Sequence, residues 1–549
     1  MTGFEKPMMD APGSTMATIG ERRPRSEPPA SVLASHSILD GRATFLACTV
    51  VCGAAAAIIA LISFAELALP LSTDQALYSF IGRAIHHGAV PYRDFTDLKP
   101  PGIFYVRAIL DALAPVSWTG ACFSGSIQPS CGWLVVKLAD LATTLLFALT
   151  LYATARSMQF DRAAAVLAGA LGAVYVSLSY ISQMGLTPEK LAAMCTLGAV
   201  LFAARRRWLL AGMAVGLAVL MKQPAATALL PVCVFAVNTR RRLPAMLQVL
   251  VGLAAPLLLV ALVLQAQAAL QAAISYVVMI NFERIGTPAR LGGFGGDGSI
   301  QTAWQAFRDG LAPFWLLGGA GALASTALPP RWRWPLLAWF VVDALLLLRL
   351  REFIQLGPSI ALLGAWAATR IWRAAGQPPY AGLSTSIAAR CVLVGVFASL
   401  VALSSSYQLS IVMRAINERT QRNFVRSPDE FVADALARVP PGPLFVWGNG
   451  AELYLLTDRA PASTTLNVIP LSSNLPGAQS RRAALIQQLQ TTRPVAIVVS
   501  PEVDRPDNGI SLRDFPQLNT LLQQDYAPVD DLVRDRKYGG WQLYVLRTA

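Results

Sequence analysis

Hydrophobic residues along this chain are gathered into long, nearly uninterrupted runs separated by short polar segments. The first run, "FLACTVVCGAAAAIIALISFAEL", begins at Phe45. Its length suits a helix that crosses a bilayer, which needs about 20 apolar residues. Further spans are predicted at residues 133–154, 163–181, 188–204, 208–221, 224–238, 244–266, 311–328, 334–349, 354–370 and 386–408. The pattern therefore predicts a polytopic α-helical membrane protein with about eleven transmembrane helices.

Short arginine clusters separate the runs and predict their orientation. The clusters are Arg205 to Arg207, Arg240 to Arg242, Arg331 with Arg333, and Arg370 with Arg373. They follow every second span, which is the positive-inside pattern of cytoplasmic loops. The N-terminus is then cytoplasmic. Residues 1–42, rich in Pro, Ser and charge, are predicted to be a disordered cytoplasmic tail, and the first span is predicted to be a signal anchor.

This orientation leaves three segments outside the cytoplasm. Two are loops of a transmembrane domain at 43–410, namely 66–132 and 267–310. The third, 411–549, has a more soluble composition. In it "GPLFVWG", "PVAIVVS" and "GWQLYVLR" are typical of strands, while "RRAALIQQLQ" and "QLNTLLQQ" are typical of helices. We therefore expect a small C-terminal α/β extracytoplasmic domain.

Composition agrees with a membrane protein, because 54% of the residues are hydrophobic and only 14% are charged. The net charge of +13 could suit nucleic acid. The positive-inside pattern already explains where the arginines lie, so the net charge is no evidence for nucleic acid. We predict membrane lipids and no nucleic acid as partners. The Gly-rich "LGGFGGDG" lacks the order of a nucleotide-binding loop, and we predict no cofactor.

Two cysteines differ from the five that lie in apolar runs. Cys122 and Cys131 bracket the polar stretch "FSGSIQPS" in the first outer loop. Because that loop would face an oxidising compartment, we expect a disulfide between them.

Lysine is scarce, with six lysines against thirty-nine arginines. Four of the six, Lys99, Lys137, Lys190 and Lys222, fall at or just beyond the outer ends of predicted spans. The positive-inside rule predicts few cations there, so these lysines are functional candidates. Lys99 stands in "DFTDLKPPG", where the double proline stiffens the backbone and excludes a continuous helix.

Carboxylates accompany these lysines on the outer face. Asp74 follows the first span, Asp97 lies beside Lys99, and Glu189 begins the span at 188–204. Arg351 lies between two later spans on the same side. Cations can hold a phosphate group, and a carboxylate can take a proton from an acceptor hydroxyl. The set therefore suits transfer of a group from a lipid phosphate.

Simpler interpretations remain open for several residues. Lys137 and Asp140 are spaced to stabilise one helix as an i, i+3 pair. Lys222 could extend to the membrane interface without binding a ligand. His86 and His87 have the setting of ordinary surface residues, and no cluster in the sequence has metal-ligand spacing.

Three segments resemble one known family. Residues 73–106, "TDQALYSFIGRAIHHGAVPYRDFTDLKPPGIFYV", are similar to the first extracytoplasmic loop of GT-C glycosyltransferases of the protein O-mannosyltransferase and aminoarabinose transferase (family 39-like) group. "TPEKLAAMCTLGAVLFAARRRWLLAGMAVGLAVLMKQPA" resembles the family's fourth and fifth spans, and "FVWGNGAELYLLTDRAPAST" its C-terminal domain in bacterial members. The resemblance implies the GT-C fold.

The resemblance also implies a function. This is inverting transfer of a sugar from a polyprenyl-phosphate donor to a glycan, lipid or protein acceptor, on the periplasmic face of a bacterial inner membrane. By the resemblance Asp74 is the base or acceptor-orienting carboxylate, Glu189 a further acid, and Lys99 a contact to the donor phosphate. Asp97 could replace an acid that the family has next to the lysine, and Arg351 or Lys222 could share the phosphate.

The sequence departs from the family pattern at three places. Gln75 and Leu98 replace positions that are often acidic, and "REFIQLGP" replaces an aromatic-His-Tyr segment. We therefore predict no metal site. Two other function classes remain, a transporter or flippase for lipid-linked sugars and a non-catalytic binding protein. A transporter predicts polar groups near the bilayer midplane and an internal repeat, whereas the charges here gather at one face.

Overall fold

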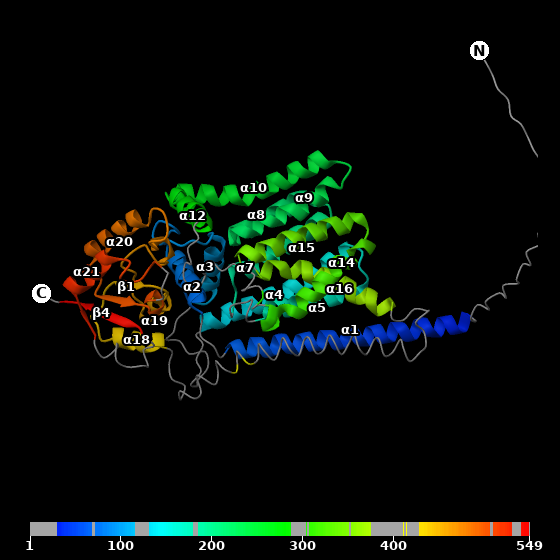
Figure 1. Cartoon of the computed structure of the whole chain (residues 1–549), viewed down its shortest axis with the longest axis horizontal. Coiled ribbons are helices and arrows are strands. Elements are labelled where there is room, and N and C mark those ends of the chain that lie inside the picture. The colour runs from blue at the N-terminus through cyan, green and yellow to red at the C-terminus, as the bar shows by residue number, and fades with distance from the viewer. Residues whose placement is uncertain are drawn as a thin grey trace, which may run out of the picture. The chain divides into compact units, whose positions relative to one another are not determined.

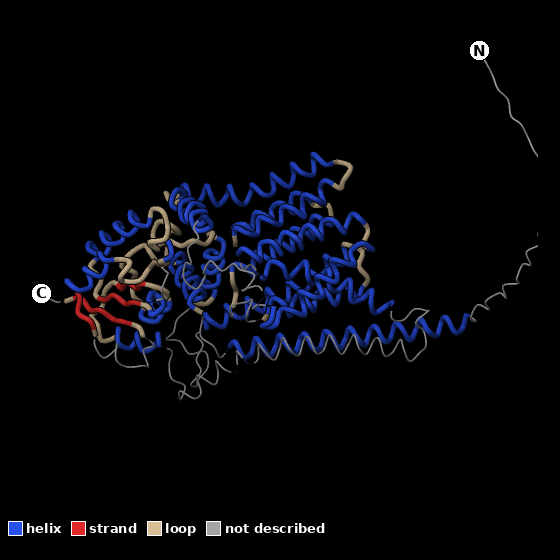
Figure 2. The backbone as a smooth tube through the Cα atoms, in the orientation of Figure 1, coloured by secondary structure: helices blue, strands red, loops and turns tan. Residues whose placement is uncertain are grey.

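The computed structural model describes residues 30–67, 72–115, 131–178, 185–286, 304, 307–350, 353–374, 410, 413, 428–504, 509–529 and 540–547 (Figures 1 and 2). The chain divides into two compact units, Met1–Ala47 and Cys48–Ala549. The first contains the beginning of helix α1 (Ala30–Leu67). The second contains every other element described below.

Ten of the described helices correspond to predicted spans. They are α1, α4 (Cys131–Ser157), α5 (Arg162–Ser177), α7 (Pro188–Ala204), α8 (Trp208–Met221), α9 (Leu229–Val237), α10 (Arg242–Ala266), α14 (Ala312–Ala324), α15 (Pro330–Leu350) and α16 (Gly357–Ala374). Among the described residues, Phe45–Ser63, Leu134–Ser157 and Arg242–Ala266 are long and apolar enough to cross a membrane by themselves. The predicted span at 386–408 lies outside the described residues, so the number of spans stays a prediction.

Small residues bring several of these helices close together. A Cβ added at Gly212 of α8 would collide with the carbonyl of Val249 on α10, and one at Gly252 of α10 would collide with the carbonyl of Leu209. Figure 1 shows α8 and α10 side by side. Close backbone approach through glycine is a common way for helices to associate in lipid.

Shorter helices connect the long ones. They are α2 (Thr73–His86), α3 (Gly102–Leu113), α11 (Leu270–Ala273) and α12 (Ile280–Gly286), the 3-10 turns η1 (Gln223–Ala228), η4 (Ser325–Ala327) and η5 (Phe353–Leu356), and the π-helical segments η2 (Ile274–Met279) and η3 (Phe307–Leu311). Helices α2 and α3 pack closely, since a Cβ at Gly82 would lie 2.5 Å from the Cβ of Arg107.

The C-terminal segment forms a four-stranded sheet with flanking helices. Its elements are α18 (Pro428–Leu436), β1 (Leu444–Trp447), α19 (Glu452–Thr457), η6 (Ile469–Leu471), α20 (Ala478–Thr492), β2 (Ala496–Val499), η7 (Pro501–Asp504), α21 (Pro516–Asp525), β3 (Tyr526–Pro528) and β4 (Gln542–Leu546). The strand order is β1-β2-β4-β3, with β1 parallel to β2 and the other pairs antiparallel. The five stretches read as strands or helices in the sequence correspond to β1, α20, β2, α21 and β4. The domain boundary at 410/411 and the side of the membrane stay predictions.

The C-terminal sheet shares an apolar core with α2 and α3. Leu444 and Val446 of β1 are buried in one cluster with Tyr78 of α2 and Phe104 of α3. The opposite-facing residues of β1, Phe445 and Trp447, belong to a separate core under α20 and α21. Alternating strand residues thus join the sheet both to its own helices and to the segment that carries Asp74 and Lys99.

Close packing at Gly102 fixes where α3 begins. A Cβ at Gly102 would lie 2.5 Å from the carbonyl oxygen of Leu220, near the end of α8. Only glycine allows the two backbones to approach this closely. Lys99 stands just before Gly102 and Lys222 just after Leu220, so this contact brings the turn with Lys99 next to the end of α8.

Candidate functional site

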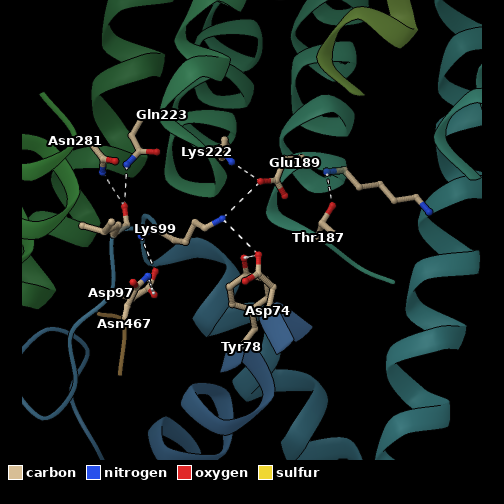
Figure 3. A network of polar contacts seen from close by, with 12 residues as sticks. Asp74, Tyr78, Asp97, Lys99, Thr187, Glu189, Lys222, Gln223, Asn281 and Asn467 are labelled. Atoms are coloured by element: carbon tan, nitrogen blue, oxygen red, sulfur yellow. Dashed lines mark hydrogen bonds and ion pairs between the residues drawn. The ribbon is translucent and has the colours of Figure 1, made fainter. Parts of the chain in front are cut away.

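Four charged side chains from separate parts of the sequence meet at one place (Figure 3). The Nζ atom of Lys99 lies 3.9 Å from Oδ2 of Asp74 and 3.7 Å from Oε1 of Glu189. The Nζ atom of Lys222 forms an ion pair with the same Glu189 oxygen. The site is therefore an alternating chain of two carboxylates and two ammonium groups.

Both carboxylates stand in the first turn of a helix. Asp74 lies near the start of α2, whose N-cap is Ser72. Glu189 follows Pro188 at the start of α7, where the N-cap Thr187 accepts a hydrogen bond from the Lys190 backbone. The partial positive charge of a helix N-terminus stabilises a carboxylate. The local sequence "LTPEK" is a typical helix start and gives Glu189 this position.

The two lysines sit where regular structure ends. Lys99 follows the loop at 94–98 and precedes Pro100, while Lys222 is the C-cap residue of α8, in extended conformation. Their side chains are 20% and 15% exposed, and those of Asp74 and Glu189 are 28% and 16% exposed. The four groups are thus partly shielded from water and still accessible to a ligand.

Tyr78 adds a polar group that the sequence reasoning missed. Its hydroxyl donates to Oδ2 of Asp74 at 3.3 Å, and Lys99 Nζ lies 5.8 Å from the centre of its ring. The i, i+4 spacing from Asp74 on one helix face could have indicated this contact. Burial raises the pKa of Tyr78 well above its ordinary value. The hydroxyl therefore keeps its proton at neutral pH and donates a hydrogen bond to Asp74.

Asp97 occupies a different place from Asp74 and Glu189. Its side chain accepts hydrogen bonds from the Lys99 backbone N–H at 2.8 Å and from Nδ2 of Asn467 at 3.2 Å. It is 1% exposed, and burial raises its pKa. The Asp97 side chain therefore holds the backbone of the turn. Its predicted role as a substitute catalytic acid stays a prediction.

Other buried charges lie behind the site. Lys190 donates to Asp140 at 2.7 Å, joining α7 to α4. Arg107 of α3 donates to the side chain of Gln75 and to the carbonyl of Leu186. Burial lowers the pKa of Arg107 to about 10. These contacts tie α2, α3, α4 and the start of α7 together around Asp74 and Glu189.

Some predicted residues cannot be placed. Arg351 and Cys122 lie outside the described residues, as does the side chain of Cys131. The phosphate contact of Arg351 and the disulfide therefore stay predictions. In the part of the chain that the structure describes, no group of three or more His, Cys, Asp or Glu side chains could hold a metal ion.

Part of the chain matches a known protein family. The family model described as "dolichyl-phosphate-mannose-protein mannosyltransferase" matches residues 127–266. No curated protein sequence matches the chain.

Solved structures share the fold over most of the chain. ArnT from Cupriavidus metallidurans bound to undecaprenyl phosphate is 14% identical, with a TM-score of 0.52, over 89% of this chain and 97% of that one. The apo state of ArnT is 16% identical at the same TM-score, over 89% and 96%. The apo oligosaccharyltransferase from Archaeoglobus fulgidus is 12% identical with a TM-score of 0.51, over 86% and 73%.

The fold is therefore that of the GT-C glycosyltransferases, and the resemblance predicted from the sequence is confirmed. The described part of the chain shares this mostly helical fold, and three of its helices are long and apolar enough to cross a membrane. The family match covers residues 127–266 only, so membrane glycosyltransferase activity of the whole chain is a proposal. A shared fold alone does not assign chemistry, which depends on the site.

Proposed function

We propose that this protein is a membrane glycosyltransferase that moves a sugar from a polyprenyl-phosphate donor to a hydroxyl of an envelope glycan, lipid or protein. The observation that carries the proposal is the position of the Lys99 ammonium group between the carboxylates of Asp74 and Glu189, at 3.9 and 3.7 Å. A cation that can hold phosphate and an acid that can accept a proton are thus within reach of one substrate.

In the proposed reaction Lys99 and Lys222 hold the donor phosphate, with Arg351 as a further candidate. Asp74 takes the proton of the acceptor hydroxyl. The acceptor oxygen bonds to the anomeric carbon while the bond from that carbon to the phosphate oxygen breaks. The electron pair leaves with the polyprenyl phosphate, whose charge the lysines stabilise. A single displacement of this kind inverts the anomeric centre.

Glu189 lies between Lys99 and Lys222, and the same two ammonium groups would attract a phosphate oxygen. We infer that a bound donor phosphate competes with Glu189 for Lys99 and Lys222. The fold of ArnT, whose solved structure contains undecaprenyl phosphate, supports a lipid phosphate as ligand. The arginine clusters support a site on the extracytoplasmic side, and we propose that this is the periplasmic face of a bacterial inner membrane.

The test measures sugar transfer by purified protein reconstituted into membranes that contain a polyprenyl-phosphate sugar. Asp74→Asn keeps the side-chain size and removes the base, so transfer should fall by a factor on the order of 10² or more. Asp458→Asn is the matched control, because Asp458 is 78% exposed, has a left-handed backbone that asparagine tolerates, and pairs with Arg83 away from the site.

Unchanged transfer by folded Asp74→Asn protein would contradict the proposed base. A non-catalytic binding protein would give no transfer with the wild type. A transporter or flippase would move the donor lipid between leaflets and leave its sugar bond intact.

A further inference from the structure

The turn that carries Lys99 is held by hydrogen bonds to its own backbone. The N–H of Lys99 donates to Asp97 at 2.8 Å, and the carbonyl of Lys99 accepts from the hydroxyl of Tyr92 at 2.6 Å. Tyr92 has a positive φ of 67°, a conformation that is unfavourable for a tyrosine by about 1 kcal/mol. The surrounding structure therefore fixes the turn even at the expense of local strain.

Two amide side chains bind the carbonyl just before Lys99. The Nε2 atom of Gln223 donates to the Leu98 carbonyl at 3.2 Å and to the Val277 carbonyl at 3.0 Å. The Nδ2 atom of Asn281 donates to the same two carbonyls, each at 3.0 Å. We call the two amides and the two carbonyls the amide clamp, and Figure 3 shows the two amides, Gln223 and Asn281.

Each amide nitrogen of the clamp lies within hydrogen-bond distance of both carbonyls. Each amide NH2 has two hydrogens, enough to donate to both carbonyls at once. Leu98 is 4% exposed, so its carbonyl would lose these partners without gaining water if an amide were removed. Val277 lies in the π-helical segment η2, a geometry that is frequent at functional sites.

Gln223 connects the amide clamp to the charged site, because it is next to Lys222 in the chain. Gln223 directly follows Lys222, in extended conformation at the end of α8, and begins η1. Its side chain thus ties the backbone that carries Lys222 to the backbone that carries Lys99. Lysine side chains are long and flexible, so the spacing of two ammonium groups depends on how firmly their backbones are held.

We propose that Gln223 is a positioning residue that fixes the Lys99 turn against Lys222, so that one phosphate group of a lipid donor meets both ammonium groups. Asn281 completes the clamp from α12. The inference rests on the proposed function and deepens it, because it names the residues that set the phosphate-binding geometry without touching phosphate.

A double-mutant cycle tests this inference, with affinity for undecaprenyl phosphate in nanodiscs as the measurement. Gln223→Met, which keeps the length of the side chain and removes the donor, should weaken binding about tenfold. In a Lys99→Ala background the same change should weaken binding less than about twofold, because Gln223 acts through Lys99. With a donor that supports turnover, the donor KM should rise more than kcat falls.

Tyr526→Phe is the matched control. It removes one buried hydrogen bond, from the Tyr526 hydroxyl to the Pro494 carbonyl at 3.0 Å, within the C-terminal segment. It should reduce stability and leave the lipid affinity and the cycle unchanged. Gln223→Leu serves as a second variant, and loss of folded protein in both Gln223 variants would contradict a positioning role and indicate a general role in folding.

The remaining outcomes separate the inference from the function on which it rests. Wild-type protein that binds the lipid phosphate, together with a Gln223→Met variant of equal affinity, overturns the inference alone. Equal losses in the wild-type and Lys99→Ala backgrounds also overturn it. Wild-type protein without affinity for the lipid phosphate overturns the proposed function and the inference with it.

Discussion

The carboxylate of Glu189 bridges two ammonium groups, those of Lys99 at 3.7 Å and of Lys222 through a direct ion pair. The three residues come from the start of α7, the turn before α3 and the end of α8. Because both lysines share one carboxylate oxygen, the two cations converge on a single point. A phosphate oxygen of a lipid donor carries the charge needed at that point.

Replacement of Glu189 should therefore lower the stability of the protein and increase the stabilising effect of a bound lipid phosphate. In Glu189→Gln the two lysines face each other without the shared anion, and the free energy of unfolding should fall by about 3 kcal/mol. Undecaprenyl phosphate would supply the missing negative charge. Its stabilising effect on Tm should be larger in Glu189→Gln than in the wild type.

The measurement is thermal unfolding in detergent with and without the lipid phosphate. Glu283→Gln is the control, since it removes another carboxylate that pairs with a cation, Arg481 at 3.2 Å. If the lipid phosphate stabilised Glu189→Gln no more than the control variant, Glu189 and the phosphate would not share a site.

Close packing at Gly102 predicts a second effect on stability. The Cβ of Gly102→Ala would lie 2.5 Å from a backbone oxygen of α8, so the turn with Lys99 must shift. Unfolding free energy should fall by about 1–3 kcal/mol, and affinity for undecaprenyl phosphate should fall as well. The loss of stability follows from the overpacking, and the loss of affinity follows from displacing Lys99 relative to Lys222.

The matched control for this change is Gly198→Ala in α7. A Cβ at Gly198 meets nothing within 4 Å, and alanine favours a helix over glycine by about 1 kcal/mol. Gly198→Ala should leave stability equal or higher. A Gly102→Ala protein that matches it in both stability and affinity would refute the close contact.

Asp97 predicts a dependence of stability on pH. Burial raises the pKa of Asp97 above its ordinary value of 3.8, so the folded protein binds this proton more tightly than the unfolded chain. The resulting stabilisation is fully present below about pH 3.8 and is lost as the pH rises through the folded pKa. The stability of the wild type relative to Asp97→Asn should therefore fall as the pH rises from about 3.8 toward neutral.

Denaturation of both proteins across this pH range checks the sign. The comparison with Asp97→Asn cancels titration of the other groups, because only residue 97 differs. A stability difference that stays constant, or that grows in favour of the wild type as the pH rises, would contradict a buried carboxyl with a raised pKa.

Part of this site could be predicted from sequence because lysine is rare in the chain. Lys99 and Lys222 stood out at positions where topology predicts few cations, and Asp74 and Glu189 stood out as acids at the outer ends of spans. The apolar span predicted at 188–204 also begins where the structure has the start of α7, at Pro188.

The supporting residues could not be predicted in this way. Asn467 and Asp97 are 370 positions apart in the chain, and nothing local marks either as a partner of the other. Gln223 and Asn281 are ordinary amides whose role arises only where α8, α12 and the Lys99 turn meet. Such contacts depend on tertiary packing and leave no periodic pattern in the sequence.

The most direct test of the account is the affinity of Lys99→Ala for undecaprenyl phosphate, measured on folded protein. The account predicts a loss of about tenfold or more, because the cation between Asp74 and Glu189 would contact the phosphate. Arg83→Ala, which removes a positive charge that pairs with Asp458, should bind as the wild type does. Equal affinity of Lys99→Ala and the wild type would contradict the account.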